Sequence, residues 1–256
     1  MSCEKYTIVV AKYQASGYNP VMSNLFGQLV DLVFPPCCAI CKKKDQKIIC
    51  DDCLGRIVRL KPPICRICGK PKDNYFVSDL CEDCNKENIP FAVARSVALY
   101  EGTLKEAIHK FKFNGKKALS ILLGRLLVSY LKHGDIPMRE IDLIIPLPLS
   151  KKRENQRGYN QSRLLAEEIA SHYSIDLDVS SLKKIKDVAP QFELSRKERF
   201  GNIKGAFSSS PLTGKNVLLI DDIYTTGATI CEASRSLKGS GVKNVYVLTL
   251  ARAVED

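Results

Sequence analysis

The stretch VLLIDDIYTTGAT, residues 217–229, decides the fold of this chain. Its apolar run predicts a buried strand, which is followed by two carboxylates, a turn rich in threonine and glycine, and a helix. In an open α/β sheet, ligands bind at the edge where the strands end. Gly227 lets the backbone approach a phosphate closely, and the first N–H groups of the helix face that anion. The stretch therefore predicts a phosphate site, the alternative being a generic strand–turn–helix.

Outward from this stretch, apolar strands alternate with helical segments. We expect strands at 94–100, 217–222 and 244–250, a strand that runs into a proline-rich loop at 141–149, and helices at 103–113, 118–132, 160–173 and 228–238. Continuous apolar strands between helices indicate a parallel sheet covered on both faces, and hence an α/β fold. A further helix is expected at 22–34, and the polar, basic residues 187–205 are predicted to include a mobile loop.

Nine of the 11 cysteines fall between Cys37 and Cys84. Eight of them form four C-x-x-C pairs, a spacing that aims two sulfurs at one ion, and tetrahedral zinc takes two such pairs. The short gaps favour sequential pairing, although an interleaved arrangement stays open, as does an iron–sulfur cluster. We predict two structural zinc sites, whose ligands are Cys38, Cys41, Cys50, Cys53, Cys65, Cys68, Cys81 and Cys84.

Composition and charge bound the class of protein. A chain of 256 residues with 45% hydrophobic residues is not intrinsically disordered. It has no run of about 20 apolar residues, so we expect no membrane insertion. The first residues do not read as a signal peptide, and cysteines confined to one module favour a metal in a reducing cytoplasm. The net charge is +11, and residues 85–256, with 27 Lys and Arg against 19 Asp and Glu, carry most of it.

Three basic segments accompany the phosphate stretch: FKFNGKK at 111–117, IPLPLSKKRENQRGYNQS at 145–162 and QFELSRKERFGNIKGAF at 191–207. The first interleaves aromatic rings with lysines, which suits single-stranded nucleic acid. The second follows a predicted strand and supplies cations for a diphosphate or for nucleic acid. The third reads as a lid over a diphosphate. Each also has a plainer interpretation: a core phenylalanine with surface lysines, a solvated basic face, and an ordinary basic helix.

At residues 217–229 the chain resembles the motif of type I phosphoribosyltransferases that binds 5-phosphoribosyl-1-diphosphate (PRPP). The three basic segments and the double zinc ribbon with its leading helix resemble the ComF family, over roughly residues 25–252. The resemblance implies a parallel-sheet type I phosphoribosyltransferase fold preceded by a small double zinc-ribbon domain. We accordingly expect an N-terminal extension with a short helix at 1–35, the double zinc ribbon at 36–90, and a phosphoribosyltransferase-like domain at 91–256.

The resemblance also implies roles for individual residues. Asp221 and Asp222 would contact the ribose hydroxyls as the catalytic pair, and Mg²⁺ would neutralise the diphosphate. The loop that binds the 5-phosphate would be Thr225, Thr226, Gly227, Ala228 and Thr229. The cations at the diphosphate, or in a lid over it, would be Lys151, Arg153, Arg157 and Arg199. Nucleic acid would be contacted by Lys112, Lys116, Lys117, Lys151, Lys152, Arg153 and Tyr159.

The function implied by the ComF resemblance is natural competence. The protein would bind PRPP, handle incoming single-stranded DNA in the cytoplasm, and have proteins of the competence machinery as candidate partners. The alternative is an active phosphoribosyltransferase that acts on a small-molecule base or amine and has no role in DNA uptake. The sequence does not choose between them. An acceptor would bind around residues 94–117, and no residue there indicates which base or amine it would be.

Overall fold

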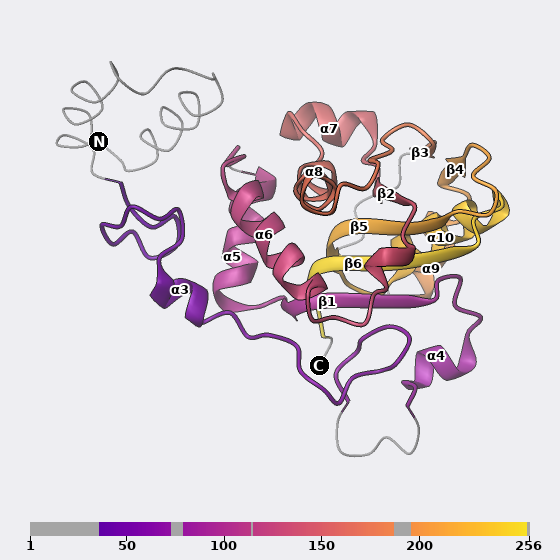
Figure 1. Ribbon diagram of the computed structural model, residues 1–256, viewed down its shortest axis with the longest axis horizontal. Coiled ribbons are helices and arrows are strands. Elements are labelled where there is room, and N and C mark those ends of the chain that lie inside the picture. Colours follow the sequence, from indigo (N-terminus) through magenta and orange to yellow (C-terminus); the bar gives the residue numbers. More distant parts are fainter. Residues whose placement is uncertain (1–35, 73–78, 114, 187–195, 255–256) are drawn as a thin grey trace.

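The computed structural model describes residues 36–72, 79–113, 115–186 and 196–254 (Figure 1). The helix expected at 22–34 lies outside these residues, and so does the 187–195 part of the expected mobile loop.

A four-stranded parallel sheet lies at the centre, with the strand order β1-β6-β5-β2. Its strands are β1 (Val93–Leu99), β2 (Leu143–Pro146), β5 (Asn216–Tyr224) and β6 (Asn244–Arg252). A separate antiparallel pair is formed by β3 (Leu182–Lys184) and β4 (Phe207–Ser209). The parallel α/β class predicted from the apolar strands is confirmed.

Helices cover both faces of this sheet (Figure 1). The first face is covered by α5 (Gly102–Phe113), α6 (Leu119–Leu131) and α8 (Gln161–Tyr173), the second by α9 (Arg196–Ile203) and α10 (Ala228–Gly239). Successive strand residues point to opposite faces, so Leu218 shares a core with Leu123 of α6, whereas Leu219 shares the other core with Leu237 of α10. This two-sided burial is why the strands are apolar throughout rather than alternating.

The strand expected to run into a proline-rich loop within 141–149 is β2, and a loop at 147–150 follows it. The next element, α7 (Lys151–Arg157), was not predicted. The Ser150 hydroxyl accepts a hydrogen bond from the Arg153 N–H at 3.4 Å and caps that helix, and Gly158 ends it at a φ of 75°. The strand expected at 217–222 continues to Tyr224. The other short helices are α3 (Asp51–Gly55), α4 (Glu82–Lys86) and the 3-10 turn η1 (Met138–Glu140).

The cysteine-rich segment attaches to both faces of the sheet. Cys38, Cys50 and Cys53 are buried in the core that holds α5 and α6. Cys65, Cys68, Cys81 and Cys84 are buried in the opposite core, together with apolar residues of β5, β6 and α10. The two halves of the predicted ribbon therefore do not form one separate lobe. The domain bounds 36–90 and 91–256 stay a prediction.

Candidate functional site

The acid pair lies on β5, beyond the end of the neighbouring strand β2. Pairing between the two strands stops at Pro146 and Ile220, where the Leu147 N–H donates to the Ile220 carbonyl at 2.8 Å. The chain after β2 then departs into α7. Asp221 and Asp222 therefore sit at the carboxyl edge of the sheet where one neighbour has ended, the position at which open α/β sheets bind ligands.

Asp221 is partly buried, and its surroundings disfavour the ionised carboxylate. Its Oδ1 accepts hydrogen bonds from the Ser162 hydroxyl at 2.9 Å and from the Asp222 N–H at 2.8 Å. Burial, and after it the neighbouring Asp222 carboxylate, raise the pKa of Asp221 to about 7. A carboxyl with such a pKa is half-protonated near neutral pH, and a cation placed beside it would keep it ionised.

Asp222 is 6% exposed, and its Oδ1 lies 2.8 Å from the ammonium of Lys112 at the end of α5. The ion pair explains how a carboxylate can be buried there, since a buried charge needs a partner. Lys112 was predicted to contact nucleic acid, but its side chain points into the site and is only 16% exposed. Nothing in the sequence around Lys112 indicates that α5 places a cation beside the acid pair.

The turn after β5 has the geometry of a phosphate loop. Gly227 takes the left-handed conformation, with a φ of 81°, and a Cβ added there would lie 2.3 Å from the Tyr224 hydroxyl oxygen. The first helical bond of α10 runs from the Cys231 N–H to the Gly227 carbonyl at 2.8 Å. The N–H groups of residues 228–230 therefore have no partner within the helix. The Ala228 N–H donates to the Thr226 hydroxyl oxygen at 3.5 Å, and the next two N–H groups can donate to an anion.

Side chains at the end of α7 and the start of α8 border the acid pair. Arg157 donates to the Gln161 Oε1 at 3.0 Å, and its guanidinium lies 5.1 Å from the centre of the Phe113 ring. Asn160 caps α8 by accepting from the Arg163 N–H and donates to the Leu147 carbonyl at 3.0 Å, which ties the two helices to the end of β2. Burial lowers the pKa of Arg157, and the charges of Asp222 and Asp221 oppose that effect, so the predicted cation interacts with both aspartates.

The eight ribbon cysteines form two clusters of four, Cys38, Cys41, Cys50 and Cys53, and Cys65, Cys68, Cys81 and Cys84. Within each cluster the sulfurs lie within 4.8 Å of one another, which selects the sequential pairing and excludes the interleaved one. The Cys50 N–H points at the Cys38 sulfur at 3.4 Å, and the Cys81 N–H at the Cys65 sulfur at 3.3 Å. Four thiolates so placed, with N–H donors on the sulfurs, suit a tetrahedral ion.

Two buried arginines that the sequence analysis missed attach the second cluster to the sheet. Arg95 of β1 donates to the Arg66 carbonyl at 2.9 Å and pairs with Asp135. Arg252 of β6 donates to the Cys68 carbonyl at 2.6 Å. Neither arginine belongs to a motif, so no local signal marks them.

Family models match both halves of the chain. Residues 29–86 match a double zinc ribbon domain, and residues 160–256 match a phosphoribosyl transferase domain. The competence protein ComFC of Bacillus subtilis is 31% identical over 221 residues, covering 82% of this chain and 86% of that protein. The competence protein F of Haemophilus influenzae is 32% identical over 213 residues, covering 80% and 90%. The DNA utilization protein YhgH of Escherichia coli K12 is 30% identical over 209 residues, covering 80% and 91%.

This chain belongs to the ComF family. The family assignment confirms the resemblance seen at residues 217–229 and the phosphoribosyltransferase-type fold behind a double zinc ribbon. It also favours zinc over an iron–sulfur cluster for the two groups of four cysteines. Cys37 lies outside both groups, so Cys38 is the ligand at that position.

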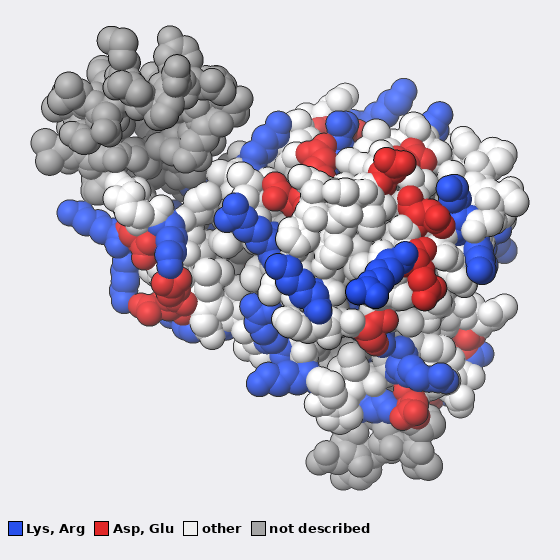
Figure 2. Space-filling view, in the orientation of Figure 1, with Lys and Arg blue, Asp and Glu red and all other residues white. Residues whose placement is uncertain are grey.

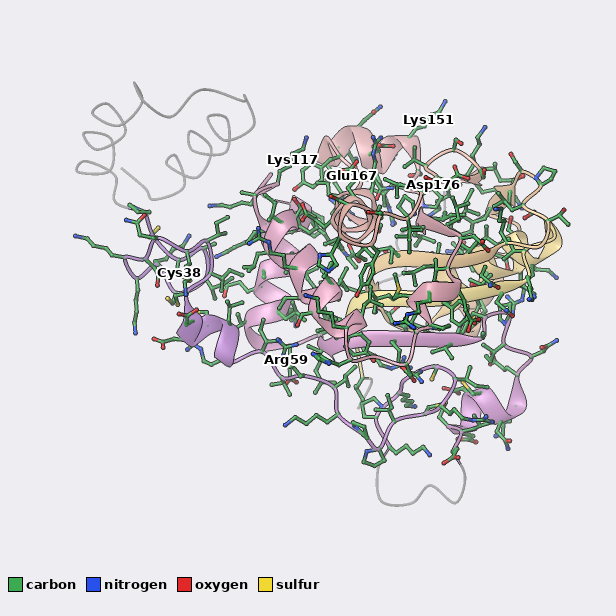
Figure 3. All side chains as sticks on the ribbon, viewed as in Figure 1. Cys38, Arg59, Lys117, Lys151, Glu167 and Asp176 are labelled. Carbon is green, nitrogen blue, oxygen red and sulfur yellow. The ribbon has the colours of Figure 1, made fainter. Side chains whose placement is uncertain are left out.

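The predicted nucleic-acid residues of this ComF protein separate by burial. Lys116 is 8% exposed. Tyr159 is also 8% exposed, and its hydroxyl donates to the Phe111 carbonyl. Burial raises the pKa of Tyr159 to about 12, as expected of a ring packed inside the protein. Lys117, Lys151 and Lys152 are exposed, with Lys117 and Lys151 on the same side of the molecule (Figure 3).

The remaining predicted residues of this ComF protein fall on two elements. Arg153 is partly exposed on α7, and Arg199 lies on α9, a helix rather than a mobile loop at that position. Across the described residues, no helix is both long and apolar enough to cross a membrane.

Proposed function

We propose that this chain binds PRPP with Mg²⁺ at the carboxyl edge of β5 and uses that site in DNA uptake or utilization. One observation carries the proposal: a buried acid pair and a left-handed glycine turn follow each other on one strand, with cations from α5 and α7 around them. The carboxylates suit ribose hydroxyls, and the loop 225–229 suits the 5-phosphate. Relatives named for competence and for DNA utilization support the cellular role.

Magnesium fits the acid pair by the chemistry of its donors. Mg²⁺ prefers oxygen ligands and usually takes one or two carboxylates together with substrate phosphates. Lys112 forms its ion pair with Asp222. Burial, and after it the Asp222 carboxylate, still raise the pKa of Asp221 against the opposing effect of Lys112, so a further cation would favour the ionised form of both carboxylates. When bound, Mg²⁺ would neutralise the diphosphate oxygens of the ligand.

A buried donor also supports an oxygen-rich ligand. Gln161 is 1% exposed, and its Nε2 is buried without a hydrogen-bond partner among the described residues. The Oε1 of Gln161 accepts a hydrogen bond from Arg157, and the next residue, Ser162, donates to Asp221. The unpaired amide N–H of Gln161 therefore lies near the proposed ligand. A buried unpaired donor is costly and gains most from an acceptor that arrives with a ligand.

Calorimetric titration with PRPP and Mg²⁺ tests the site. The double change Asp221→Asn and Asp222→Asn should abolish binding, because both ribose contacts and the cation ligands are lost. The matched control is Glu167→Gln with Asp176→Asn, which removes two negative charges from α8 and from the chain just after it (Figure 3). Unchanged PRPP affinity in the Asp221/Asp222 variant would refute the site.

Turnover is tested by PRPP-dependent release of pyrophosphate, with bases, amines and single-stranded DNA offered as acceptors. Release with a base or an amine alone would support the alternative, a phosphoribosyltransferase without a role in DNA uptake. Tight PRPP binding without release would support a binding module that senses PRPP or a ribose-phosphate end.

We further propose that the exposed cations of α7, with Lys117, contact single-stranded DNA. On the face shown in Figure 2, Lys and Arg alternate with Asp and Glu instead of forming one basic patch, so a local contact fits better than a broad electrostatic surface. Changing Lys151, Lys152 and Arg153 to Ala should reduce the slope of log affinity against log salt by up to about 2, since each lost phosphate contact removes about 0.7. The control of equal charge replaces the exposed lysines 42–44 of the first ribbon with Ala. Equal slopes in the two triple variants would remove α7 from the DNA surface.

A further inference from the structure

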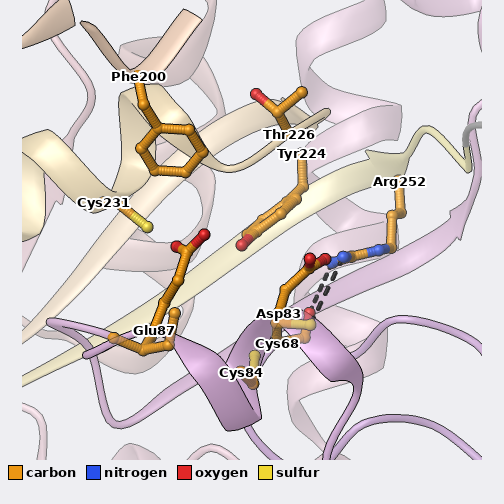
Figure 4. Close-up of a pocket in the computed structure, with 10 residues that line it drawn as sticks. Cys68, Asp83, Cys84, Glu87, Phe200, Tyr224, Thr226, Cys231 and Arg252 are labelled. Atoms are coloured by element: carbon orange, nitrogen blue, oxygen red, sulfur yellow. Dashed lines mark hydrogen bonds between the residues drawn. The ribbon is translucent and has the colours of Figure 1, made fainter. Parts of the chain in front are cut away.

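The second cysteine cluster lies directly behind the phosphate loop. A narrow pocket separates them, lined on the ribbon side by Cys68 and Cys84 and on the loop side by Tyr224 and Thr226 (Figure 4). Arg252 spans it. The cluster and the loop are far apart in sequence, so only the folded sheet brings a metal site next to a ligand site.

Arg252 is the link on the metal side. It is 5% exposed at the end of β6, and its Nη1 donates to the Cys68 carbonyl at 2.6 Å. Its Nη2 donates to the Cys68 sulfur at 3.5 Å (Figure 4). The guanidinium therefore holds both the backbone and the ligand atom of one cysteine. Because the donors of an arginine have fixed geometry, movement of Cys68 must either carry Arg252 along or break both bonds.

Tyr224 is the link on the loop side. Tyr224 and Arg252 are neighbours in the pairing of β5 with β6, and the guanidinium lies 4.2 Å from the centre of the tyrosine ring. The ring is 5% exposed and lies under the turn, where a Cβ on Gly227 would approach its Oη to 2.3 Å and its Cζ to 2.7 Å. The turn at Gly227 thus packs against the Tyr224 ring, and the ring packs against the Arg252 guanidinium.

Among the described residues, the first cysteine cluster has no such connection to the phosphate loop and is linked instead to α5, whose Lys110 donates to the Ala39 carbonyl. Its arginine contact is Arg56, which donates to the Cys53 sulfur at 2.9 Å and belongs to the same ribbon. Its buried cysteines share the core of α5 and α6, on the sheet face opposite α10. Two chemically equivalent metal sites therefore have different relations to the ligand loop.

We propose that Arg252 and Tyr224 couple the second zinc site to the phosphate loop, so that metal in the cluster of Cys65, Cys68, Cys81 and Cys84 holds the loop in its binding conformation. Arg252 acts as a positioning residue, through Tyr224, on the turn at Gly227. Zinc would fix the Cys68 sulfur, which fixes the guanidinium and the ring above it. The identity of the ligand rests on the proposed function, but the effect of the metal on the loop does not.

The coupling must be reciprocal, because any free energy by which zinc favours the loop conformation is returned when a ligand selects that conformation. PRPP with Mg²⁺ should therefore protect the second ribbon, residues 64–72 and 79–86, against amide hydrogen exchange. It should leave residues 36–56 of the first ribbon unchanged. Competition with a zinc chelator should show the same asymmetry, with one of the two zinc ions released more slowly in the presence of PRPP.

The decisive variant is Arg252→Met, which keeps side-chain length but removes the donors and the charge over the ring. We expect two zinc ions per chain as in the wild type and faster amide exchange at residues 224–231. PRPP affinity should be about thirtyfold weaker, the middle of the usual range for coupled sites. Arg56→Met is the matched control, since it removes an arginine from the first cluster and should leave both loop exchange and PRPP affinity unchanged. Tyr224→Phe keeps the ring and should behave as wild type, whereas Tyr224→Leu should resemble Arg252→Met.

The outcomes separate this coupling from the proposed function. If the wild type does not bind PRPP, the proposed function fails, and exchange at residues 224–231 in Arg252→Met still decides the coupling. If the wild type binds PRPP and Arg252→Met shows the same affinity and the same loop exchange, the coupling is wrong. Should Arg252→Met fail to fold, the test uses Arg252→Lys together with the amide-exchange protection that PRPP gives the wild type. Equal protection of both ribbons by PRPP would overturn the proposal.

Discussion

The substitution Asp221→Asn should stabilise the protein at alkaline pH while weakening PRPP binding. In the folded chain, burial and the Asp222 carboxylate raise the pKa of Asp221 to about 7, against a usual value of 3.8. A carboxyl whose pKa is raised on folding binds its proton more tightly in the native state. The stability that it contributes is fully present below about pH 4 and is lost as the pH rises through about 7.

The magnitude follows from the two pKa values. A rise of about three in pKa corresponds to about 4 kcal/mol in the free energy of unfolding once the pH exceeds 7. An asparagine does not ionise, and its Oδ1 can accept the same two hydrogen bonds, from the Ser162 hydroxyl and the Asp222 N–H. The variant should therefore match the wild type within about 1 kcal/mol at pH 4 and exceed it by up to about 4 kcal/mol at pH 8.

Urea unfolding at a series of pH values, with zinc present throughout and without Mg²⁺, measures this difference. The exposed Asp176→Asn is the control, for which the difference from wild type should stay constant with pH. Millimolar Mg²⁺ should shrink the advantage of Asp221→Asn at pH 8, because a cation at the acid pair relieves the same repulsion. A pH-independent difference, or a variant less stable than wild type at pH 8, would refute the electrostatic account of the site.

Two further substitutions test contacts on either side of the sheet edge. Gly227→Ala should weaken PRPP binding by at least about a hundredfold in calorimetry. A left-handed φ costs an alanine about 1–2 kcal/mol, and its methyl group would displace the Tyr224 ring. Wild-type affinity in this variant would show that the turn does not bind the ligand. Arg95→Met should lower the free energy of unfolding by about 1–3 kcal/mol, because it leaves the Arg66 carbonyl without its buried donor, whereas Asp135 is half exposed and can be hydrated. A loss below about 0.5 kcal/mol in urea unfolding would contradict that role.

The elements at the centre of the sheet could be predicted because their sequence pattern is strong. The apolar run at 217–220 and the acid pair after it reflect burial on two faces and a ligand edge, and both are local properties. The turn at 225–229 was predicted for the same reason, since glycine and threonine follow the strand directly, and Gly227 takes the left-handed conformation there. That the turn binds a phosphate stays a prediction. The helix α7 had a local signal that was passed over: a capping serine, seven residues without proline, and Gly158 at the end.

The contacts between distant segments could not be predicted. Lys112 was interpreted as a surface cation because nothing in FKFNGKK indicates that α5 ends over Asp222. Tyr159 was interpreted as a stacking ring, although the fold buries it against Phe111. The pairing of the four C-x-x-C turns stayed open because spacing alone permits both arrangements, and only the folded chain brings Cys41 beside Cys50 and Cys68 beside Cys81.

A boundary at residue 90 does not separate the hydrophobic cores, because each core contains residues from both sides of it. Cysteines of the first cluster share a core with α5, and Lys110 of that helix donates to the Ala39 carbonyl. The second cluster shares the other core with β5, β6 and α10, and the Ala94 N–H of β1 donates to the Ile67 carbonyl at 2.7 Å. Metal binding supplies folding free energy to the structure around it. Because each cluster is part of a different core, zinc stabilises both faces of the sheet, and a chain that began at residue 91 would lack packing on each of them.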